Sequence, residues 1–165
     1  MIFCVLSDSH GDLASIDSML GDLQAKDIVV QAFIHAGDCA IDTDYIRRQT
    51  GLPTYTVWGN SDIYRYRQIY KPDEFIEIDG HTIWLTHGHK YLQDSDDVHL
   101  LREQAQIFSA DIVIYGHTHK PHIVELEHIL FLNPGSTARP RNSNSSYALL
   151  DINGSNIQTT ICEIC

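Results

Sequence analysis

The sequence predicts an α/β protein in which two β-sheets pack face to face and helices cover their outer surfaces. In the first half of the chain, apolar β-branched segments alternate with helical patterns, which is typical of a parallel sheet. From Glu74 onward, tight turn sequences separate the apolar segments and favour antiparallel hairpins. A chain of 165 residues, 43% of them apolar, can bury a core of this kind, so we expect residues 1–165 to form one domain.

The expected strands are apolar segments that end at glycine, proline or small polar residues. In chain order they cover residues 2–7, 28–35, 53–58, 74–78, 82–86, 111–115, 122–126, 129–132, 147–152 and 157–164. Three turn sequences favour hairpins between neighbouring strands: Asp79-Gly80, Glu127-His128 and Asn153-Gly154.

The first helix is predicted by apolar residues that recur at helical spacing between Leu13 and Leu23. Asp12 precedes them and is a residue type that caps a helix N-terminus. A second amphipathic pattern covers residues 95–108, and shorter helices are expected over residues 43–50 and 64–69.

The composition excludes several classes of function. A formal net charge of −11 and a pI near 5.1 argue against binding to long nucleic acids or to membranes. No apolar segment approaches the roughly 20 residues that span a bilayer. The first strand leads directly into Asp8, so we interpret it as structural and not as a signal peptide.

The four cysteines are interpreted as reduced thiols of a cytoplasmic protein. Cys4 and Cys39 lie in or beside apolar segments and read as small core residues. Cys162 and Cys165 lack the second pair of a Cys₄ metal site, and we interpret them as a frayed terminus.

Five short polar clusters follow predicted strands, each at the strand's C-terminal end. They are Asp8-Ser9-His10, Gly37-Asp38, Gly59-Asn60, Thr86-His87-Gly88 and Gly116-His117-Thr118-His119. The carboxyl ends of parallel strands meet at one edge of a sheet, so we expect these side chains to converge. On extended backbone, the i and i+2 spacing of Asp8 and His10 points both side chains the same way. Together the clusters supply the ligands for two metal ions with Asp38 free to bridge them, the usual apparatus for hydrolysis of a phosphate ester.

The remaining histidines of this kind are not expected to be ligands. A single histidine at a strand end is more often hydrogen-bonded or exposed than bound to a metal. We apply that interpretation to His35, His81, His99, His122 and His128.

Taken in order, the clusters resemble the motifs of the calcineurin-like metallophosphoesterases. The similarity runs from Ile2 to about Ser136 and includes Asn133-Pro134-Gly135-Ser136, which is typical of the small bacterial and archaeal branch of YfcE-like phosphodiesterases. The resemblance implies a four-layer αββα sandwich with two facing mixed sheets and a binuclear metal site at their rims.

The resemblance also implies how the ligands divide. Asp8, His10 and His119 would hold one ion, Asn60, His87 and His117 the other, and Asp38 would bridge them. Imidazole and carboxylate ligands suit Mn²⁺, Fe²⁺, Co²⁺, Ni²⁺ or Zn²⁺ and disfavour Cu(I), and the family favours Mn²⁺.

The expected reaction is hydrolysis of a small phosphodiester by a hydroxide that bridges the two ions, with Asp38 and Asn60 acting in catalysis. Ser61 stands where the larger family often has a histidine that assists the leaving group, so strong general-acid help is in doubt. His89 either touches the substrate, donates a proton or is merely exposed. Asp62 either orients Asn60 or is a turn residue.

Several alternatives stay open. Arg139 and Arg141 either clamp a phosphate at the rim or belong to a solvated loop. A phosphomonoesterase and a non-catalytic scaffold of the same fold, as in the retromer subunit that resembles this family, are the competing functions. The complete ligand set favours the enzyme, and a nuclease is disfavoured because no basic stripe is present. A homodimer through exposed apolar surface is a further hypothesis.

Overall fold

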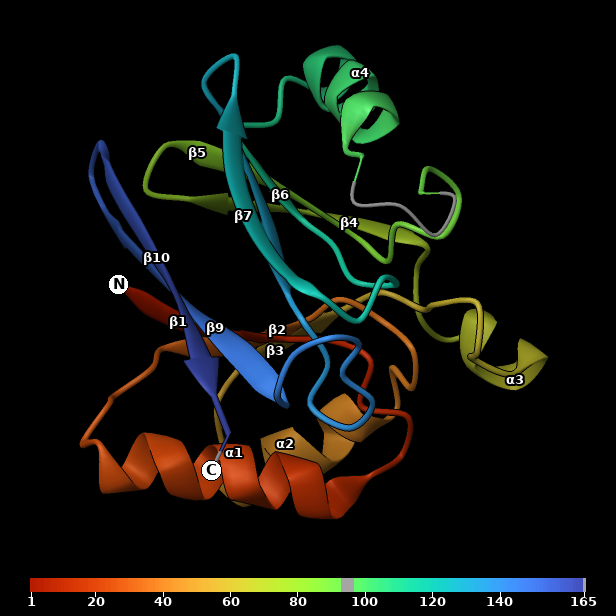
Figure 1. Cartoon of the computed structure of the whole chain (residues 1–165), viewed down its shortest axis with the longest axis vertical. Helices are drawn as coiled ribbons and strands as arrows, with labels where there is room; N and C mark the ends of the chain where they lie inside the picture. Colours follow the sequence, from red (N-terminus) through yellow and green to blue (C-terminus); the bar gives the residue numbers. More distant parts are fainter. Residues whose placement is uncertain (93–96, 165) are drawn as a thin grey trace.

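The computed structural model describes residues 1–92 and 97–164 and contains two five-stranded sheets that face each other (Figure 1). The first sheet has the order β10-β9-β1-β2-β3. Its strands are β1 (Ile2–Leu6), β2 (Ala32–His35), β3 (Thr54–Thr56), β9 (Ser146–Asn153) and β10 (Asn156–Glu163). The second sheet has the order β4-β5-β6-β8-β7. Its strands are β4 (Asp73–Ile78), β5 (His81–Thr86), β6 (Ile112–Ile114), β7 (Pro121–Leu126) and β8 (Ile129–Pro134).

Four helices complete the described part of the chain: α1 (Leu13–Ala25), α2 (Asp42–Thr50), α3 (Tyr64–Arg67) and α4 (His99–Phe108). Helices α1 and α2 lie on the outer side of the first sheet and α4 lies beyond the second sheet, whereas α3 projects to one side (Figure 1). The expected arrangement of helix, sheet, sheet and helix is therefore confirmed. No helix in residues 1–92 or 97–164 is long and apolar enough to cross a membrane.

The interior of the fold follows from the alternation of side chains along each strand. Phe3 and Val5 of β1 face the second sheet and belong to the core between the sheets. Cys4 and Leu6, the residues between and after them, pack instead with α1 and α2 on the outer face. A third cluster, which includes buried Trp84, packs α4 onto the second sheet.

Helix α1 begins as predicted, because the Asp12 carboxylate accepts a hydrogen bond from the Ser15 backbone N–H at 3.3 Å. The three expected hairpins are also present, since β4 pairs with β5, β7 with β8 and β9 with β10, all antiparallel. The helix expected over residues 95–108 is described only from His99, because residues 95 and 96 lie outside the described part of the chain.

Strands β2 and β3 differ most from their expected lengths, and both are shorter. Residues 28–30 precede β2 as a connection, and Val29 is 74% exposed there. Strand β3 ends at Thr56 because the next residues turn to a different partner. Val57 forms an isolated bridge with Lys71, and the Trp58 N–H donates to the Lys71 carbonyl at 2.9 Å.

The parallel pairing of strands determines where the candidate site lies. Strands β1, β2 and β3 run parallel in the first sheet, and β5, β6 and β8 run parallel in the second. The loops after these strands therefore leave each sheet at its carboxyl edge, which is where ligands bind in open α/β sheets.

Candidate metal centre

Five of the seven candidate ligand residues have left-handed backbone, whereas Asn60 and His87 do not. The φ angles are +54° for Asp8, +48° for His10, +59° for Asp38, +71° for His117 and +60° for His119. The expectation that Asp8 and His10 point the same way because they lie on a strand is therefore wrong. Their side chains converge because the chain turns sharply after β1. Non-glycine residues in this region are strained, and such strain gathers at functional sites.

One group of four side chains forms the first half of the centre. Ligand atoms of Asp8, His10, Asp38 and His119 all lie within 4.8 Å of one another. His119 Nε2 lies 3.2 Å from Asp8 Oδ1 and 3.4 Å from His10 Nε2. His10 Nε2 lies 3.7 Å from Asp38 Oδ2. These are the residues that the family resemblance assigns to one ion together with the bridging carboxylate.

The second group adjoins the first through Asp38. His87 Nε2 lies 3.3 Å from Asp38 Oδ1 and 3.1 Å from Asn60 Oδ1. The rings of His87 and His117 have centroids 5.4 Å apart. Asp38 thus directs one carboxylate oxygen toward His10 and the other toward His87. The fold brings all the predicted ligand residues together, with Asp38 between the two groups.

The hydrogen bonds of two imidazoles leave their Nε2 atoms free to bind a cation. His87 Nδ1 donates to the Ala36 carbonyl at 2.7 Å, and His119 Nδ1 donates to the Arg139 carbonyl at 2.6 Å. In the neutral tautomer each Nε2 then carries a lone pair. Nitrogen and carboxylate oxygen atoms this close, without protons between them, suit a bound cation.

The Asp8 carboxylate supports the same interpretation. Asp8 Oδ1 is buried and has no hydrogen-bond partner of good geometry among the described residues. Burial opposes ionisation of Asp8, but the adjacent His119 and His87 lower the pKa of this carboxyl overall. The same carboxylate raises the pKa of His119. A buried carboxylate oxygen of this kind, 3.2 Å from the Nε2 atom of His119, is a suitable position for a metal ion.

Two glycines allow the ligand loops to approach closely. A Cβ atom on Gly116 would lie 1.9 Å from Ser7 Oγ and 2.8 Å from Asp8 Oδ2. A Cβ atom on Gly59 would lie 2.1 Å from Asp38 Oδ1. Glycine is needed at both positions because any side chain would push a candidate ligand away.

Ser61 and Asp62 hold the loops that carry Asp38. The Ser61 backbone N–H donates to Asp38 Oδ1 and its hydroxyl donates to Asp38 Oδ2, both at 2.8 Å. The buried Asp62 carboxylate accepts from the backbone N–H groups of Gly59, Cys39 and Ala40. Asp62 therefore ties two loop backbones together through backbone N–H groups, which supports the turn-residue alternative.

A buried polar chain that the sequence did not suggest lies beneath the ligands. The Gly37 N–H donates to His35 Nδ1 at 3.1 Å, so Nε2 carries the proton and donates to Ser9 Oγ at 2.8 Å. The Ser9 hydroxyl donates in turn to Asp42 Oδ2 at 2.7 Å, which also accepts from the Gly11 N–H. This network fixes the loop after β1. As expected, His35 is hydrogen-bonded rather than a candidate ligand.

His89 lies beside the second group and packs against Trp58. Its ring centroid is 5.4 Å from that of His87 and 5.3 Å from that of Trp58. Burial, together with the adjacent His87 and His117, lowers the pKa of His89 to about 4. His89 is therefore a neutral imidazole near pH 7, which argues against its acting as a proton donor.

The candidate centre opens into a cavity of about 310 Å³. Its lining combines candidate ligands with Ser61 and two arginines: His10, Asp38, Asn60, Ser61, His117, His119, Arg139 and Arg141. Arg139 adds to the effect of burial in lowering the pKa of His10.

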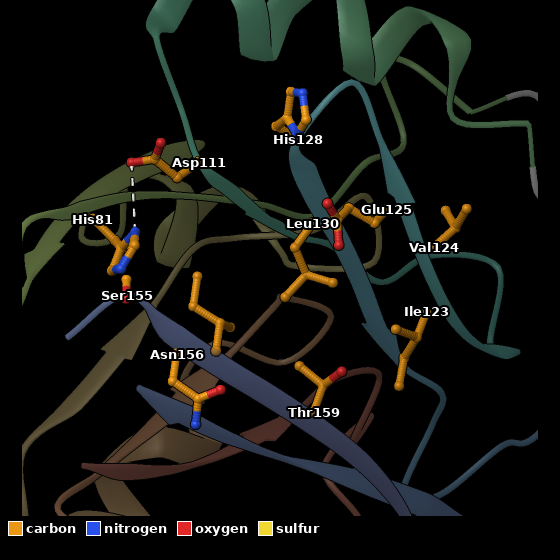
Figure 2. Close-up of a pocket in the computed structure, with 11 residues that line it drawn as sticks. His81, Asp111, Ile123, Val124, Glu125, His128, Leu130, Ser155, Asn156 and Thr159 are labelled. Atoms are coloured by element: carbon orange, nitrogen blue, oxygen red, sulfur yellow. Dashed lines mark ion pairs between the residues drawn. The ribbon is translucent and has the colours of Figure 1, made fainter. Parts of the chain in front are cut away.

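A larger cavity of about 560 Å³ lies elsewhere, where β10 of the first sheet passes near β7 and β8 of the second (Figure 2). His81 and Asp111 face each other at one end, 4.0 Å apart, while His128 lies apart from them. Among the residues that the structure describes, only Asp8, His10, Asp38 and His119 form a compact group of potential metal ligands. Residues of this group line the smaller cavity and not this one.

The other predicted non-ligands lie outside this group. His81 bonds to the Gly154 carbonyl and His122 to the Tyr115 hydroxyl, while His99 pairs with Glu103. Cys4 is buried and Cys39 and Cys162 are partly exposed, all three as free thiols. Cys39 is thus not a core residue. Cys162 is not in a frayed terminus as expected, because it lies in β10 and pairs with Tyr147 of β9, whereas Cys165 lies outside the described residues.

Comparison with known proteins identifies the family. The model of the calcineurin-like phosphoesterase superfamily domain matches residues 1–155. The chain belongs to this superfamily. It is 35% identical over 164 residues to a probable metallophosphoesterase of Methanothermobacter thermautotrophicus, covering 98% of this chain and 91% of that protein.

Two further comparisons bear on function. The chain is 31% identical over 84 residues to the phosphodiesterase YfcE of Escherichia coli, covering 50% of this chain and 41% of YfcE. It is also similar to Vps29 of Entamoeba histolytica in complex with Zn²⁺, with 26% identity, a TM-score of 0.73 and complete coverage of both chains.

Proposed function

We propose that this protein is a metal-dependent phosphodiesterase that hydrolyses small phosphodiesters at a binuclear centre. The observation that carries the proposal is the position of Asp38, whose two carboxylate oxygens face separate groups of nitrogen and oxygen ligands 3.3 and 3.7 Å away. A carboxylate so placed can hold two cations side by side. Membership of the phosphoesterase superfamily supports the same reaction class.

The residues present fit such ions. In the proposed site, Asp8, His10 and His119 would hold one cation, Asn60, His87 and His117 would hold the other, and Asp38 would be shared between them. When bound, two divalent cations would lower the pKa of a water and stabilise negative charge on the phosphoryl oxygens. The lack of thiolate among these ligands favours Mn²⁺, Fe²⁺, Co²⁺, Ni²⁺ or Zn²⁺, and Mn²⁺ is the first to test.

The chain's own residues fix these groups in place before the substrate arrives. Backbone carbonyls of Ala36 and Arg139 orient the two imidazoles, and Ser61 holds both oxygens of Asp38. We assign Asn60 to orienting the substrate phosphoryl group as well as to metal binding. His89, neutral near pH 7, is assigned to a hydrogen bond with the substrate and not to proton donation.

Two alternatives remain for the experiment to separate. A phosphomonoesterase would use the same ligands. A non-catalytic scaffold of the same fold is the second alternative, and the similarity to Vps29 supports including it. The intact set of candidate ligands favours an enzyme, because a scaffold is free to lose them.

Metal analysis of the purified protein followed by a hydrolysis screen tests the proposal. We expect two equivalents of Mn²⁺ per chain and hydrolysis of bis(p-nitrophenyl) phosphate faster than that of p-nitrophenyl phosphate. Asp38→Asn is the matched variant, because it removes the negative charge of the carboxylate and keeps the size of the side chain. Hydrolysis of the monoester alone would indicate a phosphatase, and Mn²⁺ binding without hydrolysis of any ester would indicate a scaffold.

A further inference from the structure

Arg139 and Arg141 lie on the loop after β8, and hydrogen bonds tie this loop to candidate ligands on both sides. The Arg139 carbonyl accepts from His119 Nδ1 at 2.6 Å, and the Arg141 N–H donates to the His119 carbonyl at 3.0 Å. The Arg139 N–H donates to Ser136 Oγ, and the Ser136 hydroxyl donates to the Asp8 carbonyl, both at 2.8 Å. The backbone that carries both arginines is therefore held in a fixed position against the candidate centre.

The two arginine residues line the cavity of the candidate centre. Both line the 310 Å³ cavity together with Asp38, Asn60 and His117. Both residues are exposed and also line the cavity, so they lie where the cavity opens to solvent. A guanidinium group binds a phosphate or carboxylate through two parallel hydrogen bonds.

The positive charge at this cavity is greater than is needed to attract a phosphodiester with a single negative charge. The reacting group of a phosphodiester carries one negative charge. In the proposed centre, two divalent cations against the carboxylates of Asp8 and Asp38 already leave a positive surplus that can attract it. Two arginines line the same cavity beside this surplus, in a chain with a net charge of −11, and their positive charge favours a second anionic group there.

We propose that Arg139 and Arg141 form a second anion subsite, so that the preferred substrates are small phosphodiesters that carry another phosphate or carboxylate close to the reacting phosphorus. The inference rests on the proposed function and names the substrate class of the same site. Because the second group does not react, its contacts act on substrate binding and appear in KM more than in kcat.

A pair of substrates that share one leaving group tests this subsite. Thymidine 5′-(p-nitrophenyl phosphate) and its 3′-phosphorylated form differ by one phosphate and have the same scissile bond. With Mn²⁺ we expect kcat/KM to be higher for the 3′-phosphorylated ester by about tenfold or more, mainly through KM. In the Arg139→Gln/Arg141→Gln variant this ratio should fall to about one.

Arg48→Gln is the matched control, because Arg48 is an exposed arginine of α2 and does not line this cavity. It removes the same kind of surface charge and should keep the substrate ratio of the parent chain. Calorimetric titration with Mn²⁺ alone should give the same affinity for the parent chain and Arg48→Gln. The double variant should bind Mn²⁺ at least as tightly as the parent chain, because it loses positive charge beside the centre and no candidate ligand.

Direct binding separates the subsite from catalysis. Titration of the Mn²⁺-loaded protein with thymidine 3′,5′-bisphosphate and with thymidine 5′-phosphate should show tighter binding of the bisphosphate, and the double variant should lose the difference. If the parent chain hydrolyses neither ester but keeps this binding preference, the proposed function fails and the subsite stands.

Two other results would overturn the subsite. Equal hydrolysis and equal binding of the two members of each pair would mean that no second anion is recognised. Slower hydrolysis of both esters by the same factor in the double variant would mean that the arginines act on the reacting phosphoryl group instead.

Discussion

Replacement of Gly59 by alanine would test how closely the candidate centre is packed. A Cβ atom at this position would lie 2.1 Å from Asp38 Oδ1, 2.6 Å from the Asp38 backbone nitrogen and 2.8 Å from the His87 ring. Because a backbone atom is among these contacts, rotation of the Asp38 side chain cannot relieve the overlap. The φ angle of Gly59 is not positive, so alanine adds no backbone strain and the effect is steric.

The magnitude follows from the overlap. Ordinary contact with a Cβ atom begins near 3.4 Å. Asp38 must therefore retreat by about 1 Å, and a displacement of this size at a reacting centre lowers the rate about 100-fold. The forced shift of the loop should cost about 1–3 kcal/mol in the free energy of unfolding.

Three measurements on Gly59→Ala check this reasoning: Mn²⁺ affinity by calorimetry, the hydrolysis rate of bis(p-nitrophenyl) phosphate, and urea unfolding. Gly21→Ala is the control, because Gly21 lies in α1 with no atom within 4 Å of its added Cβ. It should stabilise the protein by about 0.5–1 kcal/mol and leave metal affinity unchanged. If Gly59→Ala keeps the parent Mn²⁺ affinity and rate, then contact between Gly59 and Asp38 does not set the position of the carboxylate.

Three further predictions concern other parts of the site. Asp38→Ala should lower the rate by about 10³-fold or more and abolish binding of the second Mn²⁺ equivalent, a larger effect than His89→Ala; a variant that keeps most of its rate would exclude the bridging role. Because the Ser61 hydroxyl donates to Asp38 and is a poor acid, rates on a series of aryl and alkyl diesters should depend steeply on the leaving-group pKa, and a shallow slope would reveal an unrecognised acid. Burial lowers the pKa of His35 in the folded protein. As the pH falls through about 6.5, this histidine is therefore protonated in the unfolded chain before it is protonated in the folded one. Below that pH, His35 should lower the free energy of unfolding by at most about 1.4 kcal/mol per pH unit. Urea unfolding of the metal-free protein at pH 7.5 and 5.5 should show a smaller loss for His35→Gln than for the parent chain, and equal losses would contradict this account.

The fold was largely predictable from the sequence because its elements have regular apolar periodicity. Strand β1 alternates between two buried faces, and α1 carries its own N-cap in Asp12. The ends of β2 and β3 were predicted less well, because they depend on long-range pairing. Val57 reads as a strand residue, yet its partner is Lys71, which no local pattern indicates.

The sequence predicted which residues form the candidate site but not their geometry. Convergence of the ligands follows from strand direction, which the sequence pattern carries. Left-handed backbone at residues such as Asp8 and His117 is set by the surrounding tertiary structure, since neither is a glycine. The contact of Ser9 with His35 and Asp42 joins residues 26 and 33 positions apart, so local sequence gave no signal for it.

The division of the candidate ligands between the two sheets has a consequence for folding. Asp8, His10, Asp38 and Asn60 follow strands of the first sheet, whereas the remaining ligands, His87, His117 and His119, follow strands of the second. Neither sheet alone holds a complete set of ligands. A cation bound by ligands from both sheets therefore also links the two sheets. Its binding energy adds to the stability of the docked state only. Retention of the metal would therefore report whether the two sheets have packed against each other correctly.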